Sequence, residues 1–240
     1  MSEQTNPSRR SAERLSPRIA EELRGLVVSG ELTGGTKLRT EHLAARFGVS
    51  ATPIREALMT LHGEGLVTFE PGRGFTVVPI TRQDLLDLYN AQAHLAGQLC
   101  ARAVGRFSDD DLRTLWRLQD ELIGAIEAKD PAADRIEFEF HHVINHVADA
   151  PKLRWLLKMT TSHIPFQSWH VVPGWAPAAP EDHLPILRAL STKNADAAQM
   201  SMTAHIMNVG DLLAGLLAER GVLSDPAESG ETTPKDVGTA

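Results

Sequence analysis

The stretch from Gly48 to Leu66, GVSATPIREALMTLHGEGL, decides the fold that the sequence predicts for the N-terminal part of the chain. Gly48 suits the left-handed conformation that ends a helix, and Ser50 suits the N-cap of the next helix. Apolar residues then recur at helical spacing and mark a buried side: Ile54, Ala57, Leu58 and Leu61. Arg55 lies off this stripe, so the pattern predicts a helix-turn-helix whose second helix presents an arginine to DNA.

Two more helices are predicted before this stretch. The first opens at Ser16-Pro17 and closes at Gly30. The second covers about 41–47 and is capped by Thr40. Both carry apolar residues at helical spacing that mark an inward face: Ile19, Leu23 and Val27 in the first helix, and Leu43, Ala44 and Phe47 in the second.

A β-hairpin is predicted after the reading helix. Residues 66–70 and 75–78 are short β-type runs separated by Pro71-Gly72-Arg73-Gly74. Arg73 at the tip suits a contact to phosphate or to the minor groove, and an ordinary solvated turn arginine is the alternative. Three helices followed by a hairpin form a winged helix, so residues 14–79 are predicted to be a winged helix-turn-helix DNA-binding domain.

The charge distribution permits DNA binding by one part of the chain. The 240 residues carry a net charge of −7, which by itself argues against nucleic acid. Residues 1–78, however, hold 10 Lys and Arg against 9 Asp and Glu, and the remainder holds 14 against 22. A protein in which only one module touches phosphate can have this balance.

The cysteine content and the hydropathy predict a cytoplasmic protein with no membrane partner. Cys100 is the single cysteine, so no disulfide within the chain is possible. The sequence shows neither a signal peptide nor a long apolar run.

The remainder of the chain has a helical pattern, and the predicted fold class is mainly α. An all-helical domain is expected over 80–223, between a disordered start over 1–13 and a disordered tail over 224–240. Its predicted helices cover about 82–104, 109–129, 131–150, 151–170, 181–191 and 194–221, with a loop over 171–180.

Three histidines and one glutamate are predicted to face the interior of this domain. At ~100° per residue, Glu137 and His141 stack one turn apart at the inner edge of their helix. His183 and His205 each lie within an apolar stripe of another helix. The pair His142 and His146 falls on the opposite, solvated face.

A divalent metal ion would satisfy all of these inward polar groups. An unpaired buried carboxylate costs several kcal/mol, so Glu137 needs partners. Three imidazoles and one carboxylate suit Zn²⁺, Ni²⁺, Mn²⁺ or Fe²⁺. For each histidine taken alone, an ordinary core residue with satisfied hydrogen bonds is the alternative.

The segment from Leu15 to Val78 resembles the DNA-binding domain of the GntR family of bacterial transcription regulators. Three blocks match that family's pattern in order: LVVSGELTGGTKL, LAARFGVSATPIREAL and LHGEGLV…PGRGFTVV. Many members have arginine at the position of Ala51, so one common DNA contact is absent. The resemblance implies that DNA is contacted by Arg55, Thr52, Ser50 and Arg73, with Arg39 and Arg46 within reach of the backbone.

The helical half resembles the FCD type of effector domain found in the same family. Metal-binding FCD domains use an Asp-x-x-x-His pair and two further histidines, which correspond here to Glu137, His141, His183 and His205. Gln92 aligns with an arginine that in many FCD domains pairs with an effector carboxylate, although a core glutamine bonded to backbone is the alternative. His163 and Gln167 are further candidates for the effector pocket. Trp155 and Trp169 are expected to pack in the core, and lining the pocket is the alternative for both.

These observations favour a transcriptional regulator over an enzyme. The resemblance implies a homodimer that binds a two-fold operator and is a repressor released by a small organic-acid-type metabolite beside the metal. A metal-activated water is the enzymatic alternative, but no independent general base stands out on an inward face. A purely structural metal is the third possibility.

Overall fold

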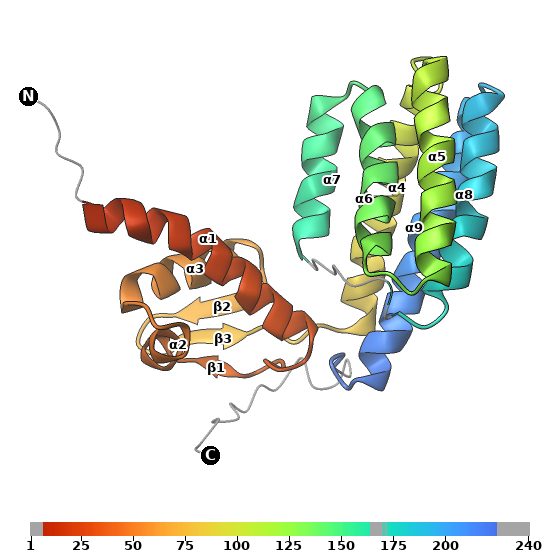
Figure 1. Cartoon of the computed structure of the whole chain (residues 1–240). Coiled ribbons are helices and arrows are strands. Elements are labelled where there is room, and N and C mark those ends of the chain that lie inside the picture. The colour runs from red at the N-terminus through yellow and green to blue at the C-terminus, as the bar shows by residue number, and fades with distance from the viewer. Residues whose placement is uncertain (1–6, 164–169, 171, 225–240) are drawn as a thin grey trace, which may run out of the picture. The chain divides into compact units, whose positions relative to one another are not determined.

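The computed structural model describes residues 7–163, 170 and 172–224, so the predicted disorder of residues 1–6 and 225–240 lies outside the described residues. Its described part is mainly helical, with a small antiparallel sheet, which confirms the predicted fold class (Figure 1). The chain forms two compact units. Of the described residues, the first contains those up to Arg82, His163 and 217–224, and the second contains 83–162, 170 and 172–216.

The first unit is a three-helix winged fold. Its elements in order are α1 (Pro7–Val28), β1 (Lys37–Leu38), α2 (Thr40–Phe47), α3 (Ala51–Gly63), β2 (Val67–Glu70) and β3 (Gly74–Val77). Gly48 ends α2 at φ 65°, a left-handed conformation that suits glycine. The apolar stripe of α3 is buried as predicted, since Ile54, Leu58 and Leu61 have no exposed surface.

Two local predictions for this unit are wrong, and one short strand was not predicted. Helix α1 starts at Pro7 rather than at Ser16, so residues 7–13 are helical and not disordered as predicted. The helix keeps Pro17 inside it and extends toward the N-terminus because residues 9–15 are mostly good helix formers. Thr40 is the first residue of α2 and not its cap, since the N-cap is Arg39. The hairpin gains a third strand, because Lys37 and Leu38 pair with Thr76 and Phe75.

In its described residues, the second unit is a bundle of six helices. They are α4 (Arg82–Ala103), α5 (Asp109–Glu127), α6 (Ala132–Val147), α7 (Pro151–His163), α8 (Trp175–Ser191) and α9 (Ala195–Glu219). Ser108 starts α5 with a complete capping box, in which it exchanges hydrogen bonds with Asp111. None of the described helices is both long and apolar enough to cross a membrane.

Helix α8 is longer than predicted. The stretch 175–180, predicted as loop, forms the first turns of α8, where Pro177 lies within the first turn and its missing N–H costs nothing. Helix α7 (Pro151–His163) confirms the described part of the helix predicted over 151–170, and the prediction for residues 164–169 lies outside the described residues. The extra length of α8 does not alter the prediction of which residues of α6, α8 and α9 face the interior of the bundle.

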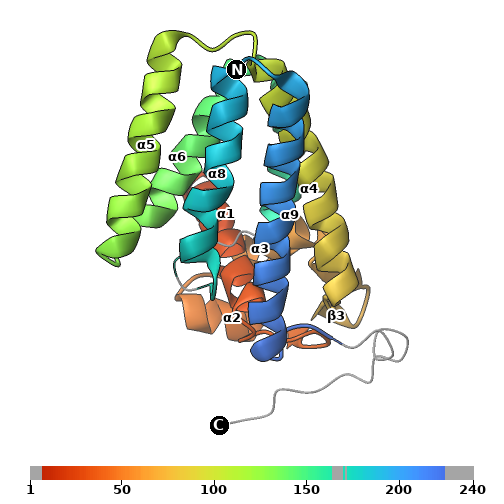
Figure 2. The ribbon, with the colours of Figure 1, turned by 90° about the vertical axis from the view of Figure 1, so that its right-hand side faces the viewer.

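Close packing between α4 and α9 holds the last helix in register. A Cβ placed on Gly210 of α9 would lie 2.5 Å from Cγ of Tyr89 on α4, so only glycine fits there. In Figure 2, α9 lies between α8 and α4. The position of α9 matters because it carries His205.

Candidate metal centre and nucleic-acid interface

Helix α6 supplies two neighbouring polar side chains to the bundle interior. Glu137 is 5% exposed and His141 is partly buried. Their i, i+4 spacing stacks them one turn apart, and His141 Nε2 lies 3.3 Å from Glu137 Oε1. The periodicity of α6 therefore turns both toward the same point.

Helices α8 and α9 bring two more histidines to that point. His183 and His205 are 0% and 1% exposed. His183 Nε2 lies 3.5 Å from Glu137 Oε2, and His205 Nε2 lies 3.6 Å from Glu137 Oε1 and 3.1 Å from His141 Nε2. One donor atom from each of the four residues lies within 4.8 Å of all the others. The structure thus brings together the four residues that the sequence selected.

The cluster has polar atoms that no protein group satisfies. Among the described buried side chains, Glu137 Oε2, His183 Nε2 and Trp175 Nε1 have no hydrogen-bond partner. Two of these three atoms belong to the cluster and lie next to each other. Buried polar atoms are nearly always paired, so two adjacent exceptions indicate that the interior suits an additional cationic partner.

The protonation states of the cluster follow from its burial and its charges. Burial lowers the pKa of His183 to about 4, so its imidazole is neutral near pH 7. For His205, burial favours the neutral form, but hydrogen bonds and charges from Asp182 and Glu137 outweigh it and raise its pKa to about 9. Burial also opposes ionisation of Glu137, yet the surrounding imidazoles hold its pKa well below the usual value.

Three side chains around the cluster were missed by the sequence analysis. Gln119 on α5 is 1% exposed, and its Oε1 lies 3.0 Å from Nδ1 of His183. Asp182 contacts Nδ1 of His205 at 3.3 Å and accepts a hydrogen bond from Asn208 at 2.9 Å. Gln119 could have been found from the sequence, because it is a polar residue within the apolar stripe of α5.

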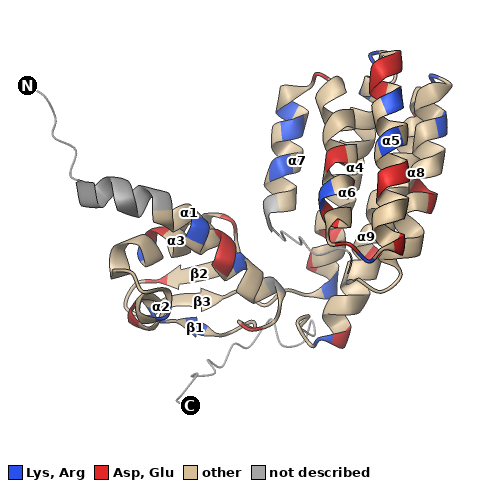
Figure 3. Cartoon of the chain, in the orientation of Figure 1, with Lys and Arg blue, Asp and Glu red and all other residues tan. Residues whose placement is uncertain are grey.

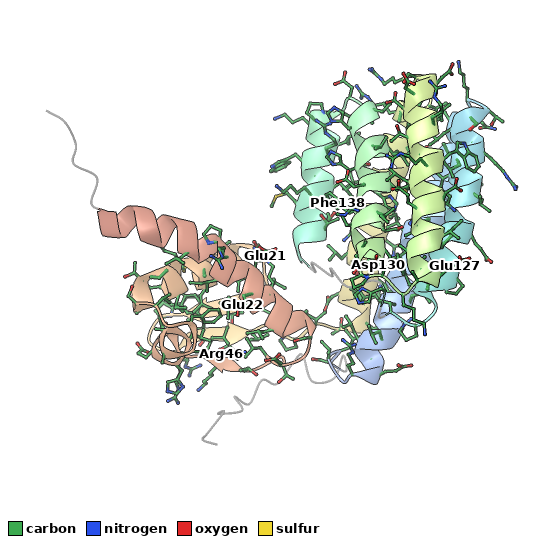
Figure 4. The ribbon with its side chains drawn as sticks, viewed as in Figure 1. Glu21, Glu22, Arg46, Glu127, Asp130 and Phe138 are labelled. Carbon is green, nitrogen blue, oxygen red and sulfur yellow. The ribbon has the colours of Figure 1, made fainter. Side chains whose placement is uncertain are left out.

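The other histidine pair lies outside. His142 and His146 are both exposed, as predicted, with parallel rings 6.1 Å apart. Phe138, on the same face of α6, is 65% exposed and projects from the bundle in Figure 4. These residues face away from the cluster of Glu137, His141, His183 and His205, and none of them belongs to it.

The structure describes only some of the residues that were predicted to bind the effector. Gln92 is buried, and its Nε2 donates to the backbone oxygen of Thr160 at 3.3 Å, as expected of a core glutamine. The side chain of His163 and all of Gln167 and Trp169 lie outside the described residues. Trp155 was expected in the core but is 58% exposed on α7, because the helix turns this side chain toward solvent.

The predicted DNA-reading face lies on the outer side of α3. Ser50, Thr52 and Arg55 are exposed, and Arg55 lies over the ring of Phe69, with its guanidinium carbon 6.0 Å from the ring centre. An open hollow of about 560 Å³ follows this face and is lined by Thr52, Arg55, Glu56, Met59 and Thr60. Sequence reasoning missed the last three, although they continue the helical spacing from Thr52.

The other predicted DNA contacts are exposed cations around α3. Arg73 at the hairpin tip has an 80% exposed side chain and pairs with Glu70 at 3.2 Å. Arg46 pairs with Glu31 at 3.2 Å and projects from the edge of the unit (Figure 4), and Arg39 is also exposed. Basic and acidic side chains are mixed over this unit (Figure 3), as the near-neutral count predicted.

Comparison with known families gives one match in the N-terminal part of the chain and one in the helical part that follows it. The profile described as "Bacterial regulatory proteins, gntR family" matches residues 15–77, and that of the FCD domain matches residues 87–208. The FCD match alone covers half of the chain.

Several curated proteins are similar over most of this chain. The Nta operon transcriptional regulator of Aminobacter aminovorans is 26% identical over 214 residues, 88% of this chain and 99% of that protein. The transcriptional repressor RspR of Escherichia coli is 28% identical over 79% of this chain and 84% of its own length. The gluconate operon transcriptional repressor of Bacillus licheniformis is 35% identical over 54% of this chain and 51% of that protein.

Solved structures show the same fold. McbR/YncC of E. coli covers 85% of this chain and 98% of its own, with a TM-score of 0.62 and 23% identity. A putative GntR regulator from Rhodococcus covers 83% of this chain and 97% of its own, with a TM-score of 0.54 and 20% identity. The chain therefore belongs to the GntR family of bacterial regulatory proteins: it is a DNA-binding transcriptional regulator with an FCD domain, and not an enzyme.

Proposed function

We propose that this regulator is a repressor, released from its operator by a small organic-acid-type metabolite bound beside a divalent transition metal ion. The observation that carries the proposal is the adjacent pair of unpartnered buried atoms, Glu137 Oε2 and His183 Nε2. A carboxylate oxygen and an imidazole lone pair repel each other at 3.5 Å unless a cation lies between them.

The donor set fits such an ion. Ligand atoms bound at 2.0–2.1 Å in a tetrahedral site lie about 3.4 Å from one another. Through Glu137 Oε1, contacts to His141 and His205 at 3.3 and 3.6 Å and the 3.1 Å contact between those two histidines are close to that spacing. His183 lies 3.5 Å from the other oxygen of Glu137, and the four donor atoms together lie within 4.8 Å of one another. Glu137, His141, His183 and His205 would hold the ion, and nitrogen and oxygen donors suit Zn²⁺, Ni²⁺, Mn²⁺ or Fe²⁺.

When bound, the ion would supply a Lewis-acidic position to which an effector carboxylate can bind. The side chains packed around these four residues would hold them in place and exclude water from the site. His141 is the most accessible of the four, with a 20% exposed side chain, so the effector is expected to approach from its side. Gln92, His163 and Gln167 remain our candidates for further effector contacts.

DNA recognition is proposed to centre on α3 and the hairpin tip. Arg55 would read a base edge, Thr52 and Ser50 would bind next to it, and Arg73, Arg39 and Arg46 would contact the backbone. One winged helix covers half of a two-fold site, so we expect a homodimer on an inverted repeat. A protein with chromosomal DNA as its target acts in the cytoplasm.

The names of two relatives support the repressor assignment. RspR and the gluconate operon regulator are both called repressors. Gluconate is itself a carboxylate, which agrees with an acidic effector for a metal-centred pocket.

The test uses the full chain and DNA selected from a random pool by binding to it. Affinity for the selected DNA is measured with a panel of small carboxylic acids, in metal-loaded and in chelator-treated protein. We expect at least one acid to weaken DNA binding tenfold or more in the loaded protein and to have no effect after chelation. Indifference of the loaded protein to every acid would contradict effector control.

A purely structural metal is the second candidate, because four protein donors already complete a tetrahedral shell. In that case chelation lowers the thermal stability of the protein, but an active acid still releases DNA from whatever folded protein remains.

A further inference from the structure

The metal ligands are themselves held by side chains from neighbouring elements. His183 and His205 each turn Nε2 toward Glu137 and use Nδ1 for another contact. The identity of that other partner decides which ring nitrogen carries hydrogen, and therefore which one is free to bind a cation.

For His183 the partner is Gln119. The side-chain amide of Gln119 has a fixed orientation, because its Nε2 donates to the backbone oxygen of Pro180 at 2.8 Å and a carbonyl oxygen can only accept. Its Oε1 therefore faces Nδ1 of His183 at 3.0 Å, and that nitrogen must donate. The hydrogen of a neutral His183 is thus on Nδ1, and the lone pair on Nε2 points at Glu137.

For His205 the partner is Asp182. Its Oδ2 lies 3.3 Å from Nδ1 of His205 and accepts a second hydrogen bond from Asn208 at 2.9 Å. Because a carboxylate only accepts, Nδ1 of His205 is also a donor, and its Nε2 is turned to the cluster. Asp182 is 30% exposed in its side chain, whereas Gln119 is fully buried.

Packing alone does not explain these two residues. Gln119 lies on the stripe of α5 formed by Leu115, Leu118 and Leu122, where an apolar side chain would pack without the cost of burying an amide. Both polar atoms of its amide are used, one on α8 backbone and one on the ligand. This arrangement supports His183 specifically.

We propose that Gln119 and Asp182 are positioning residues of the metal centre, which hold His183 and His205 in the tautomer that presents Nε2. The inference rests on the proposed metal site. It adds that the two imidazoles are unequal donors, since a carboxylate partner makes His205 more basic than an amide partner makes His183. With Glu137 and Asp182 ionised and the three imidazoles neutral, the two negative charges match a divalent cation.

The test is a titration of full-length, chelator-treated protein with Zn²⁺ in competition with a coloured chelator. Gln119→Met keeps the side-chain length and removes both polar atoms, whereas Gln119→Glu restores an acceptor for Nδ1. We expect Gln119→Met and Asp182→Ala to weaken Zn²⁺ binding 10- to 100-fold, and Gln119→Glu and Asp182→Asn to recover part of that loss. Glu181→Gln, an exposed neighbour of Asp182, is the matched control and should bind as the native protein does.

A second readout separates positioning from a merely structural role. Thermal unfolding of the metal-free variants shows whether Gln119→Met damages the bundle itself. Histidine ¹⁵N spectra of the Zn²⁺-loaded native protein should show hydrogen on Nδ1 and metal on Nε2 for both His183 and His205. This measurement needs no variant to fold.

The outcomes distinguish the two proposals. If the native protein binds no Zn²⁺, the metal proposal and the positioning proposal both fail. If the native protein binds Zn²⁺ but Gln119→Met and Asp182→Ala bind it within twofold of native, the metal site stands and the positioning role is overturned. Metal on Nδ1 of either histidine would also overturn it.

Discussion

Arg55 is the residue from which we expect most of the sequence discrimination in DNA binding. It is exposed on α3 and lines the hollow along the outer face of that helix. A bidentate arginine–guanine contact contributes about 1–3 kcal/mol of discrimination. Arg55→Ala should therefore weaken binding to the selected DNA by about 5- to 150-fold, as measured by fluorescence anisotropy.

The control for this change is Arg73→Ala, which should weaken binding to all sequences alike and reduce its salt dependence. Unchanged circular dichroism would show that both variants fold. If Arg55→Ala keeps the sequence preference of the native protein, the assignment of α3 as the reading helix is wrong.

The raised pKa of His205 predicts how the metal-free protein responds to pH. The folded state holds this proton more tightly than the unfolded chain, since the pKa rises from 6.5 to about 9. The resulting stabilisation is fully present below pH 6.5 and is lost as the pH rises through about 9. Urea unfolding of metal-free protein at several pH values should show this decline.

Zn²⁺-saturated protein should not show the same decline, because a metal ion replaces the proton on His205. His205→Gln should also flatten the pH dependence of the metal-free protein. If the stability of that variant declines equally steeply with pH, another titratable group causes the decline.

The four ligand candidates could be predicted from sequence because helical periodicity alone turns them inward. Glu137, His141, His183 and His205 all lie on apolar faces of α6, α8 and α9. Gln119 could not be assigned in this way, because its position among leucines predicts burial but not which atom it contacts. Its partner comes from α8, a tertiary contact 64 residues away in sequence.

At the scale of elements, α1 is held to the end of α3 by one strong ion pair. Arg24 donates to both carboxylate oxygens of Glu64 at 2.7 and 2.9 Å, and both side chains are only 15% exposed. Glu64→Gln should lower the free energy of unfolding by about 1.5–3 kcal/mol, because it weakens two charge-assisted hydrogen bonds. Urea unfolding followed by circular dichroism measures this loss.

Glu31→Gln is the matched control, since Glu31 pairs with Arg46 in an exposed geometry. Its effect should stay below about 1 kcal/mol. Equal effects of the two substitutions would show that the pair between α1 and α3 contributes no more than a surface contact.

Element boundaries were predictable where local signals decide them and not where tertiary contacts do. The capping box at Ser108 and the left-handed Gly48 are local, and both ends are where the sequence placed them. Strand β1 has only two residues and exists because Lys37 and Leu38 pair with β3, so no local pattern reveals it. The prolines in 175–180 predicted a loop, but Pro177 lies in the first turn of α8, where its missing N–H costs nothing, and Pro180 lies inside the helix.

At the scale of the whole molecule, the proposed metal ligands and the proposed DNA-reading residues belong to separate compact units. His205→Ala should therefore abolish metal binding while affinity for the selected DNA stays within about threefold of native. His142→Ala, on the exposed face of α6, should keep both properties. Metal content by elemental analysis and anisotropy on the same preparations would measure both.

A His205→Ala protein that loses DNA binding together with its metal would instead show that the metal is required for the fold of the whole chain. The metal would then be structural. In that case the thermal unfolding temperature of the variant should fall together with its DNA affinity.

The most direct test of the metal centre is anomalous diffraction at a metal absorption edge, on crystals of full-length protein grown with the metal it retains on purification. We expect one strong peak per chain, about 2 Å from Glu137, His141, His183 and His205. A chain without a peak there, or with its only peak at His142 and His146, would contradict the proposed metal centre.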